Sequence, residues 1–321
     1  MYDRIRGQET AVERLKTGLR HGRVAHAYLF AGPSGVGKYT TARAFAGALL
    51  CEAGHGTGAA CGVCRQCKLF GGSGHPDYQE LVPHGSTIGI DQVRRVVSTV
   101  GRKPYRLRHV VVIDEADRCT AEAQNAFLKT LEDPPENAVF ILISAQPEAL
   151  LPTVLSRCSV VKFLRLQREI IVSELTNRHG VPVSEAKVLA VLAEGSMGRA
   201  LELRSPEIAL IRERALELAS EPTLAKVQGI LAYSKAEASK LLEFLSLWYR
   251  DLLLYRYTRD PEMVVNTDRL LKIERAEFPP ASLLAAAEAV EAGKKMLRAN
   301  VNPRLVIEGL VIRLASILGR A

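Results

Sequence analysis

HAYLFAGPSGVGKYTTARAFAGALL, residues 26–50, contains a complete strand–loop–helix pattern. Residues 27–31 are almost all apolar, as in a strand that is buried on both faces of a sheet. From residue 40 onward, apolar residues recur at helical spacing. The segment between them, GPSGVGK at residues 32–38, has the glycine pattern of a phosphate-binding loop. The order of strand, loop and helix therefore predicts a P-loop.

In a P-loop, glycines let backbone N–H groups converge on phosphate oxygens, and the following helix contributes its positive end. Lys38 would contact the β- and γ-phosphates. The motif then requires Ser or Thr to ligate Mg²⁺, but this chain has Tyr39. Thr40 lies about 100° further round the helix and is a poor substitute. We predict a pocket for ATP or ADP with an incomplete Mg²⁺ site, formed by Gly32, Gly35, Gly37, Lys38 and Thr40.

The composition is that of an ordinary globular protein. Of the 321 residues, 47% are hydrophobic and 24% are charged, and this length predicts two or three domains. The 43 Lys and Arg residues exceed the 35 Asp and Glu residues, and this modest excess permits contact with nucleic acid without establishing it. We expect a cytoplasmic protein with no membrane contact, because neither a membrane-spanning run nor a signal-peptide pattern is present.

Strand and helix patterns alternate through residue 163 and then give way to helical periodicity alone. The expected strands are residues 27–31, 77–82, 109–113, 138–143 and 159–163, with helices at 8–20, 90–100 and 120–132. This alternation predicts an α/β domain with a doubly wound parallel sheet at residues 1–163. Two all-helical domains follow, a small one at 164–204 and a larger one at 205–321. The small one should contain a helix capped by Ser184 and ending at Gly195.

Four of the six cysteines follow the spacing C-x9-C-x2-C-x2-C, namely Cys51, Cys61, Cys64 and Cys67. The two C-x2-C steps place thiolates on tight turns, which suits a closed, four-coordinate structural Zn²⁺. An iron–sulfur cluster or free thiols are the alternatives. We expect His55 and His75 to be exposed loop residues rather than ligands. Cys119 and Cys158 should pack as small apolar residues.

Two further motifs carry charge near the predicted sheet. Asp114 and Glu115 directly follow the strand at 109–113, which is the Walker B arrangement: Asp114 would hold Mg²⁺ through water and Glu115 would polarise the attacking water. A solvated turn is the alternative. Arg157 precedes the last strand, where we expect the ligand-facing rim of the sheet. Such an arginine stabilises phosphate charge in its own site or a neighbour's, or else forms a surface ion pair, and Arg199 allows the same two interpretations.

Several of these motifs together resemble one family over essentially the whole chain, the bacterial DNA polymerase III clamp-loader subunits of the AAA+ class. The resemblance rests on Gly7-Gln8, the P-loop segment HAYLFAGPSGVGK, the four-cysteine module, VVVIDEAD at 110–117, NAFLKTLEDPP at 125–135, LSRC at 155–158 and GSMGRAL at 195–201. The chain is most similar to the delta-prime type. Its tail segments WYRDLL at 248–253 and NVNPRL at 300–305 resemble the collar domain of that type.

The resemblance implies an AAA+ domain with a zinc module inserted at about residues 51–67, a helical lid and a helical collar. Arg157 would be an arginine finger that enters the ATP site of a neighbouring subunit, and Arg199 would be the sensor-2 arginine. The expected partners are gamma/tau-type motor subunits and a delta-type subunit, with the sliding clamp and primer-template DNA in the assembled complex. Tyr39 fits the degraded P-loop of the delta-prime type, and Ser144-Ala145-Gln146 departs from the Thr-rich sensor-1 pattern of active motors.

Two other functions compete with a delta-prime-like subunit of the DNA polymerase III holoenzyme. One is an ATP-hydrolysing gamma/tau-like motor of the same loader, which the intact Asp114-Glu115 pair favours. The other is a zinc-module AAA+ protein that binds nucleic acid outside a loader. Four cations flank the helix at 90–100 and would contact primer-template phosphates or form a solvated face: Arg94, Arg95, Arg102 and Lys103.

Overall fold

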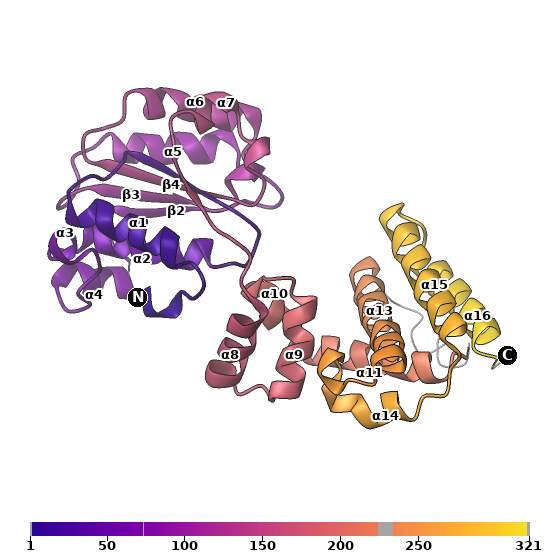
Figure 1. The fold of residues 1–321 in the computed structure, drawn as a ribbon. Coiled ribbons are helices and arrows are strands. Elements are labelled where there is room, and N and C mark those ends of the chain that lie inside the picture. Colours follow the sequence, from indigo (N-terminus) through magenta and orange to yellow (C-terminus); the bar gives the residue numbers. More distant parts are fainter. Residues whose placement is uncertain (1, 73, 224–233, 320–321) are drawn as a thin grey trace. The chain divides into compact units, whose positions relative to one another are not determined.

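The computed structural model describes residues 2–72, 74–223 and 234–319. The chain divides into two compact units, which we call the sheet unit and the helical unit (Figure 1). The sheet unit comprises Met1–Ile170 and Gly195–Gly198, and the helical unit comprises Ile171–Glu194 and Arg199–Ala321. None of the helices in the described part of the chain is both long and apolar enough to cross a membrane.

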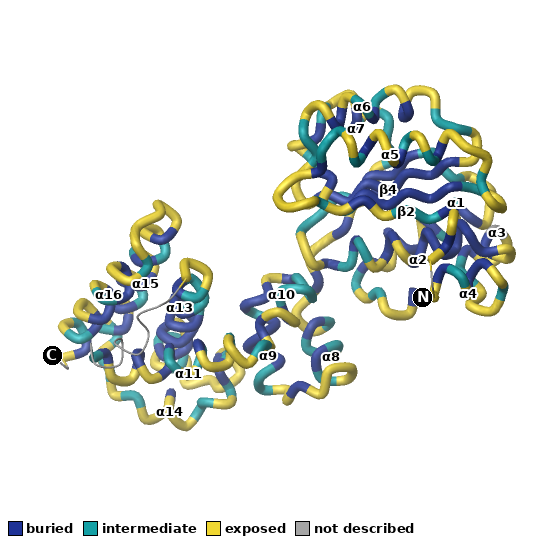
Figure 2. The backbone as a smooth tube through the Cα atoms, turned by 180° about the vertical axis from the view of Figure 1, so that it is seen from behind, coloured by how far each residue is buried: buried dark blue, intermediate teal, exposed yellow. Residues whose placement is uncertain are grey.

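The sheet unit is built on a five-stranded parallel sheet with the order β2-β3-β4-β1-β5. Its strands are β1 Ala27–Ala31, β2 Tyr78–Leu81, β3 His109–Ile113, β4 Ala138–Ser144 and β5 Ser159–Lys162. Every residue of β3 and β4 is buried, as Figure 2 shows for β4. All five predicted strands and the parallel α/β class are therefore confirmed.

Helices cover both faces of the sheet (Figure 1). One face carries α1 Glu9–Arg20, α2 Lys38–Leu50, α3 Gly54–Thr57 and α4 Arg65–Gly71, preceded by the 3-10 turn η1 Tyr2–Arg4. The other face carries α5 Ile90–Val100, α6 Ala121–Glu132 and α7 Pro152–Leu155, with the 3-10 turns η2 Ala116–Arg118 and η3 Pro147–Ala149. Because side chains alternate along a strand, Phe30 packs into one of the two resulting cores and Leu29 into the other.

The part of the chain that follows β5 contains helices and no strand among its described residues. These are α8 Arg168–His179, α9 Val183–Leu192, α10 Met197–Glu202, α11 Pro206–Ser220, α13 Lys235–Thr258, the turns η4 Pro261–Met263 and η5 Thr267–Arg269, α14 Leu270–Glu274, α15 Pro280–Arg298 and α16 Pro303–Ile317. Helix α13 packs against α11 and α15 and buries Leu241, Leu242 and Trp248.

The predicted cap of α9 is wrong. Ser184 lies inside the helix, and Pro182 occupies the N-cap position with φ −54° and ψ 141°. The ψ of Pro182 is extended rather than helical, so the helix begins directly after it, at Val183. The helix ends at Leu192, and Gly195, at φ +83°, lies in the turn that follows.

Candidate functional site

The P-loop joins the carboxyl end of β1 to the first residue of α2. Two of its glycines, Gly32 and Gly35, are required by close approach to other backbone and side-chain atoms. A Cβ at Gly32 would lie 2.2 Å from the carbonyl oxygen of Phe163, and a Cβ at Gly35, which has φ +71°, would lie 2.3 Å from Ser196 Oγ. In addition, the Gly198 N–H donates a hydrogen bond to the Gly35 carbonyl at 2.9 Å. The glycine turn at 195–198 thus packs directly on the tip of the P-loop.

Lys38 is buried at the start of α2. Its Nζ donates to the Gly32 and Pro33 carbonyl oxygens, each at 2.6 Å. Burial lowers the pKa of Lys38, while the nearby carboxylates of Asp114 and Asp117 act in the opposite direction. The P-loop lysine and the acidic residues after β3 therefore meet at one edge of the sheet, where the sequence placed the nucleotide pocket.

The Mg²⁺-ligating position of this loop carries Tyr39 in place of the Ser or Thr of the motif. Tyr39 is half-buried and packs against the core on the α2 face of the sheet. Its burial, followed by the neighbouring Glu80 carboxylate, raises its pKa. Thr40 is exposed, and the Thr41 hydroxyl donates at 2.8 Å to the backbone carbonyl of Gly37.

The Walker B pair has one carboxylate near the pocket and one engaged elsewhere. Asp114 is half-buried, accepts a hydrogen bond from the Glu115 N–H at 3.0 Å, and has a pKa raised mainly by burial. Glu115 has a left-handed backbone at φ +50° and forms an exposed ion pair with Arg118 at 2.9 Å. Asp117 accepts from the Ala145 N–H at 3.1 Å, which links this turn to the end of β4.

Arg157 lies on the opposite edge of the sheet from the P-loop, so its expected position on the ligand-facing rim is wrong. Strands β1 and β5 are parallel, with Tyr28 opposite Ser159. Arg157 precedes β5 and is therefore at the amino edge, whereas the P-loop follows β1 at the carboxyl edge. At 3.3 Å per residue, about five residues of strand place the two edges roughly 16 Å apart.

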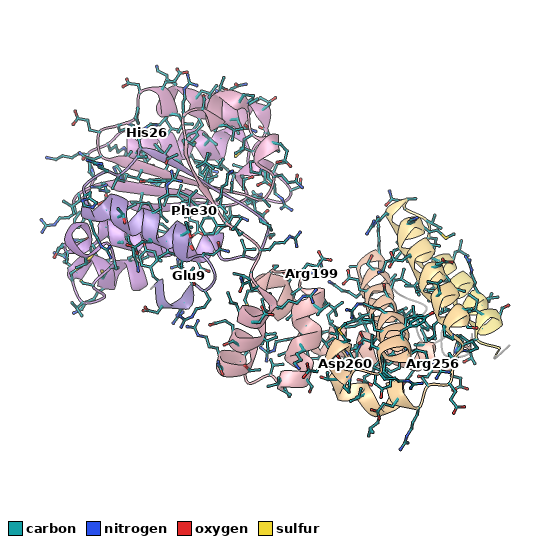
Figure 3. All side chains as sticks on the ribbon, in the orientation of Figure 1. Glu9, His26, Phe30, Arg199, Arg256 and Asp260 are labelled. Carbon is teal, nitrogen blue, oxygen red and sulfur yellow. The ribbon has the colours of Figure 1, made fainter. Side chains whose placement is uncertain are left out.

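Both candidate arginines form ion pairs with glutamates that the sequence did not single out. Arg157 Nη2 contacts Glu132 Oε1 at 2.8 Å. Arg199, labelled on α10 in Figure 3, contacts Glu243 Oε2 at 2.9 Å and Glu194 Oε2 at 3.7 Å, both within the helical unit. Glu132 is the last residue before the helix stop Asp-Pro-Pro, but its pairing with Arg157 depends on the packing of α6 against α7.

The four predicted cysteines come together at the C-terminal end of α2. Their sulfurs all lie within 4.8 Å of one another, with Cys51–Cys64 and Cys61–Cys67 each at 3.9 Å. Four sulfurs around a tetrahedral Zn²⁺ at about 2.3 Å would be about 3.8 Å apart, so the spacing fits such an ion. Backbone N–H groups of Cys64 and Val63 lower the pKa of Cys61 to about 6, which favours the thiolate form. These cysteines could bind a metal ion.

A buried polar chain connects the cysteine module to β2, and the sequence did not reveal it. His75 is only 4% exposed, so the expectation of an exposed loop residue is wrong; the side chain of His55 lies outside the described residues. His75 Nδ1 accepts from the Asp77 N–H at 3.1 Å, which leaves Nε2–H to donate to Gln66 Oε1 at 2.8 Å. Burial lowers the pKa of His75. Gln66 immediately precedes Cys67, so these hydrogen bonds hold the cysteine module against the segment that leads into β2.

The buried Asp77 carboxylate extends this support to a basic loop. It accepts hydrogen bonds from the Tyr105 N–H at 2.7 Å and the Arg106 N–H at 3.0 Å. His109 Nδ1 lies 3.6 Å from the same carboxylate. The loop before β3 is therefore held in place by backbone contacts, while the Tyr105 side chain remains exposed.

The remaining two cysteines pack as predicted. Cys119 and Cys158 border the core between α5, α6 and the sheet. Burial raises the pKa of Cys119 to about 12 and that of Cys158 to about 11, so neither thiol is activated.

Comparisons with known proteins agree along both parts of the chain. The family model described as DNA polymerase III, delta subunit, matches residues 7–167, and the model described as DNA polymerase III, delta subunit, C terminal, matches residues 212–316. The delta' subunit of Pseudomonas aeruginosa is 33% identical, and the alignment covers 92% of this chain and 93% of that protein. The delta' subunit of Bacillus subtilis is 29% identical, with 96% of each chain covered.

Tau subunits match as well, but only over part of their length. The DNA polymerase III subunit tau of Bacillus subtilis is 28% identical over 98% of this chain, which spans 61% of that protein. The delta' relatives, in contrast, are covered over 93% and 96% of their own length, at similar or higher identity. The chain belongs to the family of DNA polymerase III clamp-loader subunits of the delta-prime type.

Proposed function

We propose that this chain is a non-hydrolysing member of a clamp loader and donates Arg157 to the ATP site of a neighbouring subunit. It would assemble with gamma/tau-type motor subunits and a delta-type subunit into the ATP-dependent complex that loads the sliding clamp on primed DNA. In this proposal residues 164–204 form the lid and residues 205–321 form the collar. The observation that carries it is the position of Arg157 at the amino edge of the sheet.

That position favours a role in trans over a role in cis. The roughly 16 Å between the two edges of the sheet exceeds the length of an arginine side chain, so Arg157 does not reach its own P-loop. Its side chain is 33% exposed and therefore accessible to a partner. A guanidinium that approaches the phosphates of a neighbouring ATP would stabilise charge in the transition state for phosphoryl transfer.

The chain's own pocket supports the same assignment. Tyr39 places a phenol in contact with the core where the motif has a Ser or Thr that ligates Mg²⁺, and the Thr41 hydroxyl donates to the Gly37 carbonyl. We infer that ATP or ADP contacts the backbone of the loop and Lys38 without efficient hydrolysis. Asp114 and Glu115 would then be vestigial.

We further propose that the four cysteines hold one structural Zn²⁺. All four positions of a tetrahedral ion would be filled by sulfur, so no position would be open for catalysis. The module has little apolar core of its own, and its loops contain two glycines at positive φ, Gly58 and Gly62. A metal would supply the stability that this segment lacks.

Primer-template DNA is proposed to contact the basic segment around α5. Residues 92–113 contain no acidic residue, and Arg94, Arg95, Arg102 and Lys103 are all exposed. Within the described residues none of these four cations has an ion-pair partner. Such cations bind phosphate in a salt-dependent manner.

One observation favours the second candidate, an ATP-hydrolysing motor. Asp114 and Lys38 are close enough for the carboxylate to act on the lysine pKa, as in a working nucleotide site. The two candidates differ in what the isolated chain does, because a motor hydrolyses ATP at its own P-loop and the proposed subunit does not.

The experiment that tests the proposal is reconstitution with Arg157→Ala. We expect the complex to assemble normally but to lose turnover at the site that Arg157 serves, by about 10³-fold. Arg20→Ala is the matched control, because Arg20 forms a comparable exposed pair with Glu13 at 2.9 Å in the same unit. ATP hydrolysis and clamp loading by the assembled complex are the measurements. Unchanged turnover with Arg157→Ala would refute the trans role.

A further inference from the structure

The fold brings together Glu132 and Arg157, which are 25 residues apart and belong to two sequence motifs, the helix stop LKTLEDPP and the SRC triplet. Glu132 is the last residue of α6, and Asp133 and two prolines end the helix there. Arg157 follows the single turn of α7, whose C-cap is Ser156. The Glu132 carboxylate accepts from Arg157 Nη2 at 2.8 Å.

The Arg157 guanidinium is held by three contacts from its own chain. Besides the contact with Glu132, Nη1 donates to the Thr153 carbonyl at 2.8 Å and to Ser156 Oγ at 3.2 Å. An arginine has five N–H donors in a planar group. Two of them, the second N–H of Nη2 and the Nε–H, have no partner among the described residues. The side chain is therefore fixed in direction and can still donate to an anion.

The elements that carry this pair are tied to each other. Gln124 of α6 accepts from the Leu151 N–H at 2.7 Å and donates to the Ala149 carbonyl at 3.3 Å. Val154 of α7 is 1% exposed and packs in the core that α6 also lines. The carboxylate and the guanidinium are thus presented by a connected frame rather than by two independent loops.

Exposure argues against a role in stability. The Glu132 side chain is 54% exposed and that of Arg157 is 33% exposed, and water and salt screen such a pair. The ion pair instead limits the number of conformations available to the long side chain of Arg157. Without the carboxylate, only the backbone carbonyl of Thr153 and the Ser156 hydroxyl, both on one nitrogen, would restrain the guanidinium.

We propose that Glu132 is a positioning residue for Arg157, which it orients so that the two remaining N–H donors face the phosphates of a neighbouring subunit's ATP. The assignment rests on the proposed function, since it requires Arg157 to act in trans. Glu132 itself contacts neither ATP nor Mg²⁺. A small misplacement of a charged group costs much of the rate, so a residue that only aims the arginine should affect turnover strongly.

The test compares variants in the reconstituted clamp-loader complex. Glu132→Ala should lower kcat for ATP by about tenfold and leave KM nearly unchanged, because the lost orientation matters in the transition state. Glu132→Gln should restore most of the rate, since the amide oxygen accepts the same hydrogen bond. Glu136→Ala is the control, an exposed glutamate four residues further along the same connection to β4.

The double variant separates positioning from a general effect on assembly. Glu132→Ala with Arg157→Ala should be no slower than Arg157→Ala alone, because a positioning residue has nothing left to position. Equal turnover for Glu132→Ala and wild type, or a rise in turnover, would overturn the inference, and a rise would identify the pair as a restraint. If Arg157→Ala lowers turnover and Glu132→Ala does not, only the positioning role fails; if neither does, the proposed function fails with it.

Discussion

The two ends of α2 differ in the metal ligands that they provide. At the N-terminal end, the P-loop retains its glycines and Lys38 but lacks the hydroxyl that ligates Mg²⁺. At the C-terminal end, Cys51 caps the helix and meets three further thiols in an arrangement that fits a tetrahedral metal. Between them the helix is core, with Ala42, Phe45 and Leu49 fully buried.

This contrast separates what the helix needs for folding from what a motor needs for catalysis. At the P-loop end, the buried Lys38 ammonium has hydrogen-bond partners without any ligand, because its Nζ donates to two carbonyls of the loop itself. At the cysteine end, the thiolates need a cation, because burial alone raises the pKa of Cys51 and Cys67 and favours their protonated form. We therefore expect the fold to depend on a metal at one end of α2 and to be indifferent to a metal at the other.

The largest effect should follow from removing one ligand at the C-terminal end. Cys67→Ser should lower the free energy of unfolding by more than about 3 kcal/mol, because metal affinity contributes directly to folding. Urea unfolding of the isolated chain, with zinc content measured by elemental analysis, gives the result.

Cys119→Ser is the matched control, since Cys119 is a partly buried thiol outside the cluster. Its stability should still rise with added zinc, as in wild type, whereas that of Cys67→Ser should not. If the wild-type protein contains no zinc and chelators do not change its stability, the fold does not depend on a metal at the C-terminal end of α2.

A smaller effect should be a pH dependence of the free energy of unfolding that arises from His75, which is hydrogen-bonded to Gln66 beside the cysteine module. Burial lowers the pKa of His75 in the folded chain, whereas the unfolded chain has the ordinary value of about 6.5. Above that value both states hold a neutral His75 and its two hydrogen bonds are intact. Below it the unfolded state takes up a proton that the folded state resists, so stability should fall as the pH decreases. The facing Asp77 carboxylate moderates the effect, since it favours the protonated ring.

The measurement is the free energy of unfolding from pH 7.5 to 5.5 for wild type and His75→Gln, both saturated with zinc. Protonation of the cysteine ligands affects the two proteins alike, so the difference between the slopes reports His75. We expect the wild type to have the steeper loss, and a loss smaller than that caused by Cys67→Ser. Parallel curves would mean that the buried chain from Gln66 to Asp77 is not sensitive to this proton.

Local patterns predicted the sheet unit well because they reflect local physics. The run HVVVI at 109–113, which is β-branched from Val110 onward, predicted β3 with its bounds, and the Thr120 cap of α6 is confirmed by its hydrogen bond from the Ala123 N–H. The four-cysteine module was also recognisable, because short spacings bring thiols together whatever the rest of the fold does.

What the sequence did not reveal depends on partners distant in the chain. Glu132 and Arg157 meet only because α6 and α7 pack on the same face of the sheet. The edge on which Arg157 lies follows from strand direction, a property of the pairing between β1 and β5. His75 looked like one more polar loop residue, and its burial depends on Gln66, which comes from a helix that the sequence did not predict.

The smallest effect should be that of Mg²⁺ at the N-terminal end of α2. ATP that binds only the folded chain stabilises it according to its affinity, and with Tyr39 in place of a ligand Mg²⁺ should add nothing to that affinity. The stabilisation by ATP should therefore be the same with and without Mg²⁺, to within about 0.5 kcal/mol. Chelators must be omitted here, because they would compete for zinc at the other end of the helix.

Tyr39→Ser sharpens the same measurement, since it restores the hydroxyl that the motif requires. This variant should acquire a dependence of ATP binding on Mg²⁺ that the wild type lacks. The isolated wild-type chain should also hydrolyse no ATP above background, with or without primed DNA. A turnover of about 1 s⁻¹ would favour the ATP-hydrolysing motor instead. A strong Mg²⁺ dependence in the wild type would mean that both ends of α2 are working metal sites, and that the lost hydroxyl is replaced by a ligand from elsewhere in the pocket.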